Sequence, residues 1–247
     1  MKRAIILAGL TALLAPGDAA AQMLWTDQAF LNANIGVQAG SHTLATNSAF
    51  ELYEEPATIS SDQSVDGGAF FEIAAGYKVW RNLTVGLAFS HMSSDADVNI
   101  TGSIPDQAIT DRPRPVSGSV SGAGHSENAL HLQGVWMMPV TDKVDVGFQF
   151  GPTIFFVSQD VPTSVSVSEP GPTITSISVT DEGKTTMGIH FGIDVTYLIR
   201  PRLGIGGLAR YSWGSIDVPV ATDNLTVGGF QLGVGVRYRF DKVPFLD

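Results

Sequence analysis

The sequence predicts an all-β protein: an eight-stranded antiparallel up-and-down transmembrane β-barrel with a polar, side-chain-filled lumen. Three observations support this prediction. Apolar and polar residues alternate with a period of two in eight separate stretches, short connections alternate with long ones, and the chain opens with an export segment. No later apolar run is long enough for a membrane helix. Because only helices and closed barrels satisfy the backbone in lipid, a membrane span of this chain requires a barrel.

The export segment, MKRAIILAGLTALLAPGDAAAQ, has the three parts of a secretory signal peptide in order. A basic start precedes an apolar run too short to span a bilayer, and Ala19 and Ala21 fit an A-x-A cleavage site. We therefore expect a secretory signal peptide over residues 1–21 and an outer-membrane β-barrel domain over residues 22–247. The alternative, a short helix of the folded domain, does not explain why all three parts occur together.

The eight periodic stretches are expected to form one strand each, because a period of two is the side-chain period of a β-strand. The last stretch alternates almost without error, with Leu232 and Val234 on one face and Arg237 and Arg239 on the other. In chain order the stretches are 31–39 (LNANIGVQA), 71–79 (FEIAAGYKV), 83–89 (LTVGLAF), 130–138 (LHLQGVWMM), 146–156 (VGFQFGPTIFF), 187–197 (MGIHFGIDVTY), 203–213 (LGIGGLARYSW) and 230–240 (FQLGVGVRYRF).

The connections between these stretches are short on one side and long on the other. Arg81-Asn82, PVTDK and IRPR have the composition of tight turns. The other connections, rich in Ser, Thr, Pro, Asp and Gly, are expected to be long loops at 41–68, 93–127, 158–184 and 214–227. The third loop contains a predicted hairpin that turns at Pro170-Gly171. Short periplasmic turns and long outer loops are typical of outer-membrane barrels, and an even strand count places both termini in the periplasm.

The polar face of the strands is predicted to line the lumen. Eight strands enclose a space just wide enough to be filled by side chains, so a few large charged groups need glycine neighbours and partners of opposite charge. The predicted lumen network comprises Glu72, Lys78, His131, Asp145, His190, Asp194, Arg210, Arg237 and Arg239. Arg237 and Arg239 are expected to pair with Asp145 or Asp194. The competing fold is an exported soluble barrel of lipocalin type, which would place Phe148, Phe150, Phe191 and Phe230 inside.

The apolar face of the strands carries aromatic residues near the strand ends, where aromatic girdles meet the two bilayer interfaces. The predicted girdle comprises Tyr77, Trp136, Tyr197, Tyr211, Trp213, Tyr238 and Phe240.

With these residues in view, the chain resembles the eight-stranded outer-membrane β-barrels of Gram-negative bacteria: the OmpA-type transmembrane domain, OmpX and the OmpW-like proteins. In the last strand, Gly235, Tyr238 and Phe240 resemble the Gly-x-x-aromatic-x-aromatic signal that the barrel assembly machinery reads in this class. Barrels of this class often end at the last aromatic residue, whereas this chain continues with DKVPFLD. No peptidoglycan-binding domain follows, so the resemblance implies no anchor to the cell wall.

Enzymatic and metal sites have weaker support. His91 and Ser93 resemble the His-x-Ser pair of the outer-membrane lipid A deacylase, with Asp95 or Asp97 as the orienting acid, but a match of three letters arises easily by chance. The triplet at 125–127 (HSE) is no stronger, and an interfacial histidine beside a loop serine is the simpler interpretation. His131 and His190 lack a third ligand at metal-site spacing, so no metal and no cofactor is expected.

The sequence thus predicts an integral protein of the outer membrane with a structural or surface-interaction role in envelope integrity, adhesion or stress resistance. The first alternative is a narrow pore or transporter for small solutes or apolar molecules, and the second is a lipid A-modifying enzyme. Expected partners are outer-membrane lipid, lipopolysaccharide and, during biogenesis, the barrel assembly machinery. The formal charge of −10 argues against nucleic acid, and a monomer is expected. Divalent cations bridging to lipopolysaccharide could use the acidic first loop, which contains Glu51, Glu54, Glu55, Asp62 and Asp66; a solvated loop is the simpler interpretation.

Overall fold

The computed structural model describes residues 23–217 and 225–242 of the chain, so the predicted signal peptide lies outside the described residues. Within them no helix is long and apolar enough to span a membrane. The strands are β1 (Ala29–Ala39), β2 (Ser41–Leu52), β3 (Glu55–Asp66), β4 (Ala69–Trp80), β5 (Leu83–Pro105), β6 (Pro113–Thr141), β7 (Val144–Ser168), β8 (Thr173–Leu198), β9 (Leu203–Ile216) and β10 (Leu225–Phe240).

Eight of these strands close into an antiparallel ring. Its order is β4-β1-β10-β9-β8-β7-β6-β5, and β5 pairs again with β4. The first and last strands meet in register, with Ala29 opposite Phe240 and Ala39 opposite Phe230. The sequence prediction of an eight-stranded up-and-down barrel is therefore confirmed, and the start of β1 and the end of β10 lie at the same end of the barrel.

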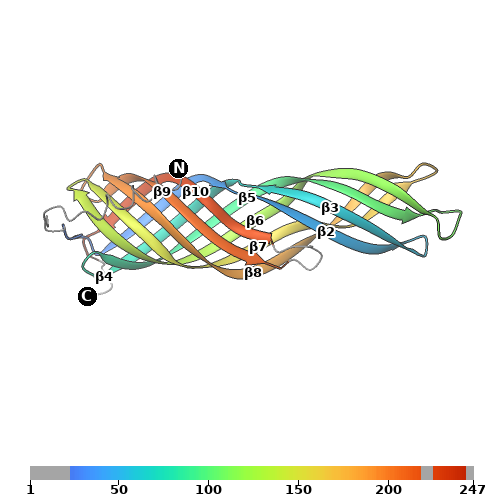
Figure 1. Cartoon of the computed structure of the whole chain (residues 1–247). Coiled ribbons are helices and arrows are strands. Elements are labelled where there is room, and N and C mark those ends of the chain that lie inside the picture. The colour runs from blue at the N-terminus through green and yellow to red at the C-terminus, as the bar shows by residue number, and fades with distance from the viewer. Residues whose placement is uncertain (1–22, 218–224, 243–247) are drawn as a thin grey trace, which may run out of the picture.

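The prediction of long loops at 41–68, 93–127 and 158–184 is wrong, because these segments consist mainly of strands. Residues 41–68 form the hairpin β2–β3, and β5, β6, β7 and β8 run far past the ring (Figure 1). β3 pairs with β5 from Thr58 to Gln63, which attaches the hairpin to the projecting strands. The β7–β8 turn does fall around Pro170, as predicted, but its strands continue those of the barrel. Of the fourth predicted loop, residues 218–224 lie outside the described residues.

We call this projecting part the extension. It comprises β2, β3, residues 94–126 with the outer parts of β5 and β6, and residues 159–183 with the outer parts of β7 and β8. The loop prediction failed there because the outward positions carry Ser, Thr, Asp and Gly, the residues that also dominate loops. The inward positions nevertheless alternate as a strand requires: Val98, Ile100 and Val165 are buried while their neighbours Asn99, Thr101 and Ser166 are exposed.

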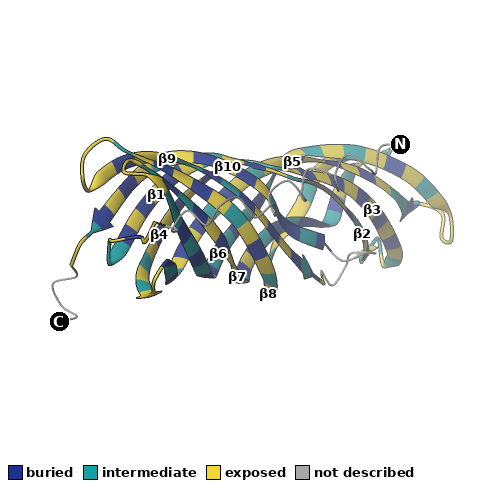
Figure 2. Ribbon diagram, turned by 60° about the vertical axis from the view of Figure 1, so that its left-hand side comes forward, coloured by how far each residue is buried: buried dark blue, intermediate teal, exposed yellow. Residues whose placement is uncertain are grey.

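Inside and outside alternate along nearly every strand of the ring (Figure 2). The residues that a lipocalin-type barrel would bury face outward: Phe148, Phe150, Phe191 and Phe230 are 41%, 58%, 60% and 44% exposed. The ring therefore carries an apolar outer wall, and its inner wall is buried and largely polar. A closed antiparallel ring with this pattern is built to span a membrane.

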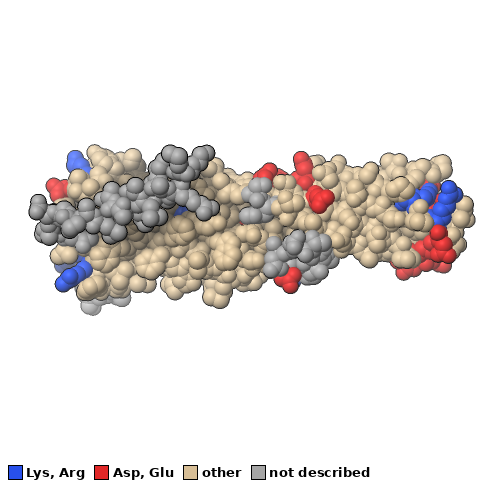
Figure 3. Space-filling view, viewed as in Figure 1, with Lys and Arg blue, Asp and Glu red and all other residues tan. Residues whose placement is uncertain are grey.

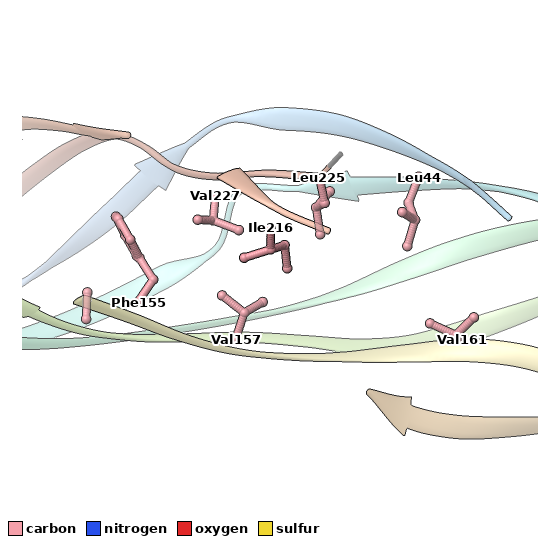
Figure 4. Close-up of a cluster of buried hydrophobic side chains, with 8 residues drawn as sticks. Leu44, Phe155, Val157, Val161, Ile216, Leu225 and Val227 are labelled. Carbon is pink, nitrogen blue, oxygen red and sulfur yellow. The ribbon is translucent and has the colours of Figure 1, made fainter. Parts of the chain in front are cut away.

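The interior changes character along its length. The barrel end at which β1 starts and β10 ends is the one expected to face the periplasm, and we call it the periplasmic end. An apolar cluster there contains Trp25, Phe30 and Met137, and the charged lumen follows. Above the charged lumen, Leu44, Phe155, Val157, Val161, Ile216, Leu225 and Val227 form a second apolar cluster with Ala129 (Figure 4). The extension then has its own apolar core around Ile59, Val98 and Ile100. The ion pairs of the lumen thus lie between two apolar clusters.

Candidate functional site

The centre of the lumen is an ion pair between Arg210 of β9 and Glu72 of β4, across the barrel interior. Arg210 is fully buried and Glu72 is 3% exposed. The same guanidinium donates to Gln231 Oε1 through Nε at 2.8 Å, and the second oxygen of Glu72 accepts from Asn34 Nδ2 at 3.0 Å. A buried charge requires a partner and further hydrogen bonds, and this arrangement supplies both.

Two more arginines occupy the lumen toward the periplasmic end. Arg237 forms a two-pronged pair with Asp194, with Nε–Oδ1 at 3.0 Å and Nη2–Oδ2 at 2.5 Å. Arg239 lies 3.6 Å from Asp145 and donates to Thr196 Oγ1 at 2.9 Å. All four ionised groups are at most 6% exposed. Two arginines on β10 therefore pair with acidic residues on β7 and β8, on the same side of the ring.

The histidines of the lumen meet through a hydroxyl. Thr153 Oγ1 lies 2.8 Å from His131 Nδ1 and 2.9 Å from His190 Nδ1, and the two rings stand edge to face at 4.8 Å. Ser90 Oγ lies 3.1 Å from His131 Nε2. The two histidines thus belong to a hydrogen-bonded interior. Among the described residues no group of three or more His, Asp or Glu is arranged to hold a metal ion.

The structure places eight of the nine predicted lumen residues in the buried interior; Lys78 is half-buried at the periplasmic mouth. Sequence reasoning missed a second polar cluster above them, built on Glu127 of β6. Its carboxylate accepts from Gly228 N at 3.1 Å and Gln38 Nε2 at 2.9 Å, and lies 3.2 Å from His125 Nε2. The sequence does indicate this cluster, because residues 123–133 alternate between the two faces of a strand and place His125 and Glu127 on the inner face. The start of the segment has the composition of a loop, and for that reason the alternation was not recognised.

These side chains fill the lumen. The cavity between them, beside Asn32, Gln133 and Gln149, has a volume of about 10 Å³. That is space for about one water molecule. Around this cavity, paired charges and amide side chains occupy the interior of the described barrel.

The predicted girdle residues all point outward, at two heights. Tyr77, Trp136, Tyr197, Tyr238 and Phe240 lie near the periplasmic strand ends, and Tyr211 and Trp213 lie near the outer ends. The rings of Tyr238 and Phe240 touch at 4.7 Å. Trp80, which the sequence reasoning did not include, is also exposed at the periplasmic end. Recognition of Gly235, Tyr238 and Phe240 by the assembly machinery stays a prediction.

The enzyme hypothesis gains little from the geometry. His91 lies in the middle of β5, opposite Phe71 of β4. Its Nδ1 is 2.8 Å from Asn128 Oδ1, and its ring is 5.5 Å from that of Phe71. Among the described contacts no hydrogen bond joins His91 to Ser93. The predicted triplet at 125–127 is not in a loop: His125 and Glu127 are buried inside the barrel. A nucleophile with an adjacent, oriented base is therefore not assembled at either position.

The tip of the extension joins three hairpins through one arginine. Arg114 of β6 pairs with Glu169 in the β7–β8 turn, with Nη1–Oε2 at 2.8 Å, and lies 3.6 Å from Asp106 in the β5–β6 loop. Glu169 also accepts from Tyr53 Oη in the β2–β3 turn at 3.4 Å. The hydrogen bond from Arg114 lowers the pKa of the Glu169 carboxyl, because it favours the ionised form. We call these four residues the tip latch.

Charged residues gather on the tip and are nearly absent from the visible lipid-facing wall (Figure 3). Of the acidic residues predicted for the first loop, Glu51, Glu54, Asp62 and Asp66 are exposed and Glu55 is half-buried. They are distributed over both strands of the β2–β3 hairpin and its turn instead of a loop. A role for them in cation-bridged contact with lipopolysaccharide stays a prediction.

A comparison with known structures finds similar folds. The chain is similar to the outer membrane protein OprG from Pseudomonas aeruginosa (11% identity, 87% of this chain and 97% of that chain covered, TM-score 0.43). It is also similar to Neisserial surface protein A (14%, 86% and 97%, TM-score 0.41) and to a major outer membrane protein from Thermus thermophilus (14%, 85% and 99%, TM-score 0.41). No protein-family model and no curated sequence matches the chain.

These likenesses concern the path of the chain and indicate no shared activity. The architecture rests on this chain's own strand pairing, a ring of eight strands with an apolar outer wall. Such a ring is the architecture of outer-membrane barrels, and the protein is an integral protein of the outer membrane.

Proposed function

We propose that this protein is a non-conducting barrel that anchors an ordered extension outside the cell, and that the extension serves a surface-interaction or structural role in the envelope. The observation that carries the proposal is the combination of a filled lumen with a packed extension. The lumen is closed by the pairs of Arg210, Arg237 and Arg239, and the extension has a buried apolar core.

The extension is packed around its own buried apolar core. Val98, Ile100 and Ile104 of β5 are at most 1% exposed, and apolar residues of β2, β3, β6, β7 and β8 pack on them. Burial of apolar surface stabilises the folded state by about 25 cal/mol per Å². An ordinary surface loop has no buried apolar core and lacks this stabilisation. A fixed surface loses less conformational entropy on binding than a mobile loop does, so an ordered extension suits recognition.

Conductance distinguishes this proposal from the pore alternative. In planar bilayers the wild-type protein is expected to give no steady unit channels. The Arg210→Ala and Glu72→Ala variants test whether the ion pair is the barrier. Steady channels in the wild type that change with these substitutions would favour transport and contradict the proposal.

The surface role is tested by a variant that disrupts the extension and keeps the barrel. Ile100→Asp places a charge in the apolar core of the extension, outside the ring, and Thr101→Asp is the matched control because Thr101 faces solvent. Cells carrying each variant are compared with the wild type for attachment to surfaces and survival in detergent. We expect a loss of one of these properties with Ile100→Asp alone. Equal behaviour of all three strains would refute the surface role.

The lipid A-modifying alternative has a simple readout. Overexpression of the protein is expected to leave the lipid A profile unchanged in mass spectrometry. Loss of an acyl chain that depends on Ser93 would reinstate the enzyme hypothesis.

A further inference from the structure

The chain segment before β1 folds back into the periplasmic mouth of the barrel. Trp25 lies in this segment and is only 3% exposed, although Met23 and Leu24 before it are 43% and 62% exposed. Its indole packs with Phe30, Val135 and Met137, with Ala74 and Ala88 completing the cluster. A residue close to the start of the described chain is thus among the best-buried aromatic side chains of the molecule.

The segment is held by side chains from the β4–β5 hairpin. Asn82 accepts from Trp25 N at 3.0 Å and donates from Nδ2 to Met23 O at 3.0 Å, so one buried amide clamps two residues of the segment. Lys78 Nζ donates to the carbonyl oxygens of Trp25 and Thr26 at 3.1 and 3.2 Å. These bonds are made to the backbone of a segment that belongs to no strand. Its backbone groups are therefore not taken up by strand pairing.

The indole also lies close to two cations. Lys78 Nζ is 5.7 Å from the centre of the Trp25 ring, and the Arg239 guanidinium carbon is 5.6 Å from it. Both distances are within the range of a cation–π interaction. Arg239 is at the same time the partner of Asp145, so the ring lies beside one member of a lumen ion pair. The apolar contacts and the two nearby cations suit a flat aromatic group with a negative face.

We propose that Trp25 is a stopper: the segment of residues 23–28 acts as an intramolecular ligand of an aromatic-binding pocket at the periplasmic mouth, and its insertion separates the ionic lumen from the periplasm. The lumen charges need this separation because water that enters from below competes for Arg239 and Arg237. The pocket accepts an indole-like aromatic group as its ligand class. Such a device goes beyond the surface role, since it concerns the opposite end of the barrel.

The chain contains no cysteine, so a single introduced thiol reports access to the lumen. Ala74→Cys places the thiol in the cluster behind the indole, where the residue is 4% exposed. A charged methanethiosulfonate reagent, added to folded protein in detergent, is expected to label it slowly. In the Trp25→Gly background we expect labelling at least about tenfold faster, and added indole should restore slow labelling by refilling the pocket. Asn82→Ala should give an intermediate rate because it releases the clamp.

Matched controls make the outcome specific. Trp80→Gly removes the same side chain at the same end of the barrel, where it is 57% exposed, and should leave the labelling rate of Ala74→Cys unchanged. Ala129→Cys, in the apolar cluster above the charged lumen, should stay protected in every background. Folding of each variant is checked by its heat-dependent migration on gels. If Trp25→Gly does not fold, Asn82→Ala and Lys78→Ala carry the comparison.

Two results would overturn the stopper. One is fast labelling of Ala74→Cys in the wild type, which would mean that the mouth is open with Trp25 present. The other is an unchanged rate in the folded Trp25→Gly or Asn82→Ala protein, which would mean that the lumen is closed without the indole. Neither result depends on what the extension binds.

Discussion

For single residues in the lumen, the sequence pattern determines which face of the strand they occupy but not which residue they pair with. Alternation alone places Glu72, Asp194 and Arg210 on the inner face, because a period of two fixes the face of every residue in a strand. It does not say which charges meet, since the partner depends on the stagger between strands that are far apart in sequence. The structure pairs Arg210 with Glu72, Arg237 with Asp194 and Arg239 with Asp145. For the last two arginines the sequence left the choice between the two acids open.

Removing one partner of the central pair should destabilise the barrel more than removing both. Arg210→Met leaves Glu72 charged and buried, so the free energy of unfolding is expected to fall by about 3–5 kcal/mol. Arg210→Met combined with Glu72→Leu should recover much of this loss, because no unpaired charge remains. Urea unfolding of the protein in detergent or vesicles measures both. Arg81→Met, at an exposed turn, is the control and should stay within about 0.5 kcal/mol of the wild type. A double variant with a lower free energy of unfolding than Arg210→Met alone would contradict the account.

Individual strands carry constraints that composition does not reveal. At the outer end of β10, Gly228 has a φ of 89° and its amide donates to the buried Glu127 carboxylate. A Cβ at Gly228 would lie 2.5 Å from Ser212 O, so the neighbouring backbone leaves no room for a side chain. The sequence shows only a glycine pair at this point, and glycines occur in many strands of this chain for other reasons. Position and backbone conformation together make this glycine necessary.

Gly228→Ala is therefore expected to cost about 1–3 kcal/mol from backbone strain alone. The close approach to Ser212 adds to this loss and should weaken the hydrogen bond to Glu127. Gly183→Ala is the matched control, because a Cβ at Gly183 on β8 meets nothing within 4 Å and its backbone is not in the left-handed region. Thermal unfolding monitored by gel migration compares the two. Equal stability of the two variants would show that the strained conformation of β10 is absent.

The tip latch should respond to acid, because it depends on the Glu169 carboxylate. The hydrogen bond from Arg114 holds the pKa of Glu169 below its ordinary value of 4.5, so the folded state favours the ionised form. The latch therefore contributes fully above about pH 4.5 and is lost as the pH falls through the lower folded pKa. Carbon NMR of the Glu169 carboxyl should give a midpoint below 4.5 in the wild type, and Arg114→Gln should raise it. A midpoint that does not move in Arg114→Gln would mean that the latch does not form in solution.

At the scale of the whole molecule, the sequence predicted the ring and missed the extension. The membrane part is recognisable because lipid requires apolar outer positions, so Ile35, Phe150 and Val234 stand out against small polar neighbours. In the extension the outer face meets water, and its Ser, Thr and Asp residues are common in loops as well as in solvated strands. The inward residues, such as Val98 and Ile100, were too few in each short segment to establish the period. The predicted hairpin at Pro170 was the one part of the extension that composition revealed.

The height of the extension above the membrane is a direct consequence of continuous strands. Phe156 is the last large exposed apolar residue of β7, and the strand continues without interruption to Ser168. With about 3.3 Å per residue and a tilt near 40°, the β7–β8 turn should lie about 30 Å above the apolar wall. A spin label at Gly171→Cys, where a Cβ has open space, reports this height by its separation from lipid-borne paramagnetic reagents. A label at Phe156→Cys marks the membrane boundary. Contact of the Gly171 label with lipid headgroups would show that the segment lies down on the membrane as a loop, and would remove the physical basis for a surface role.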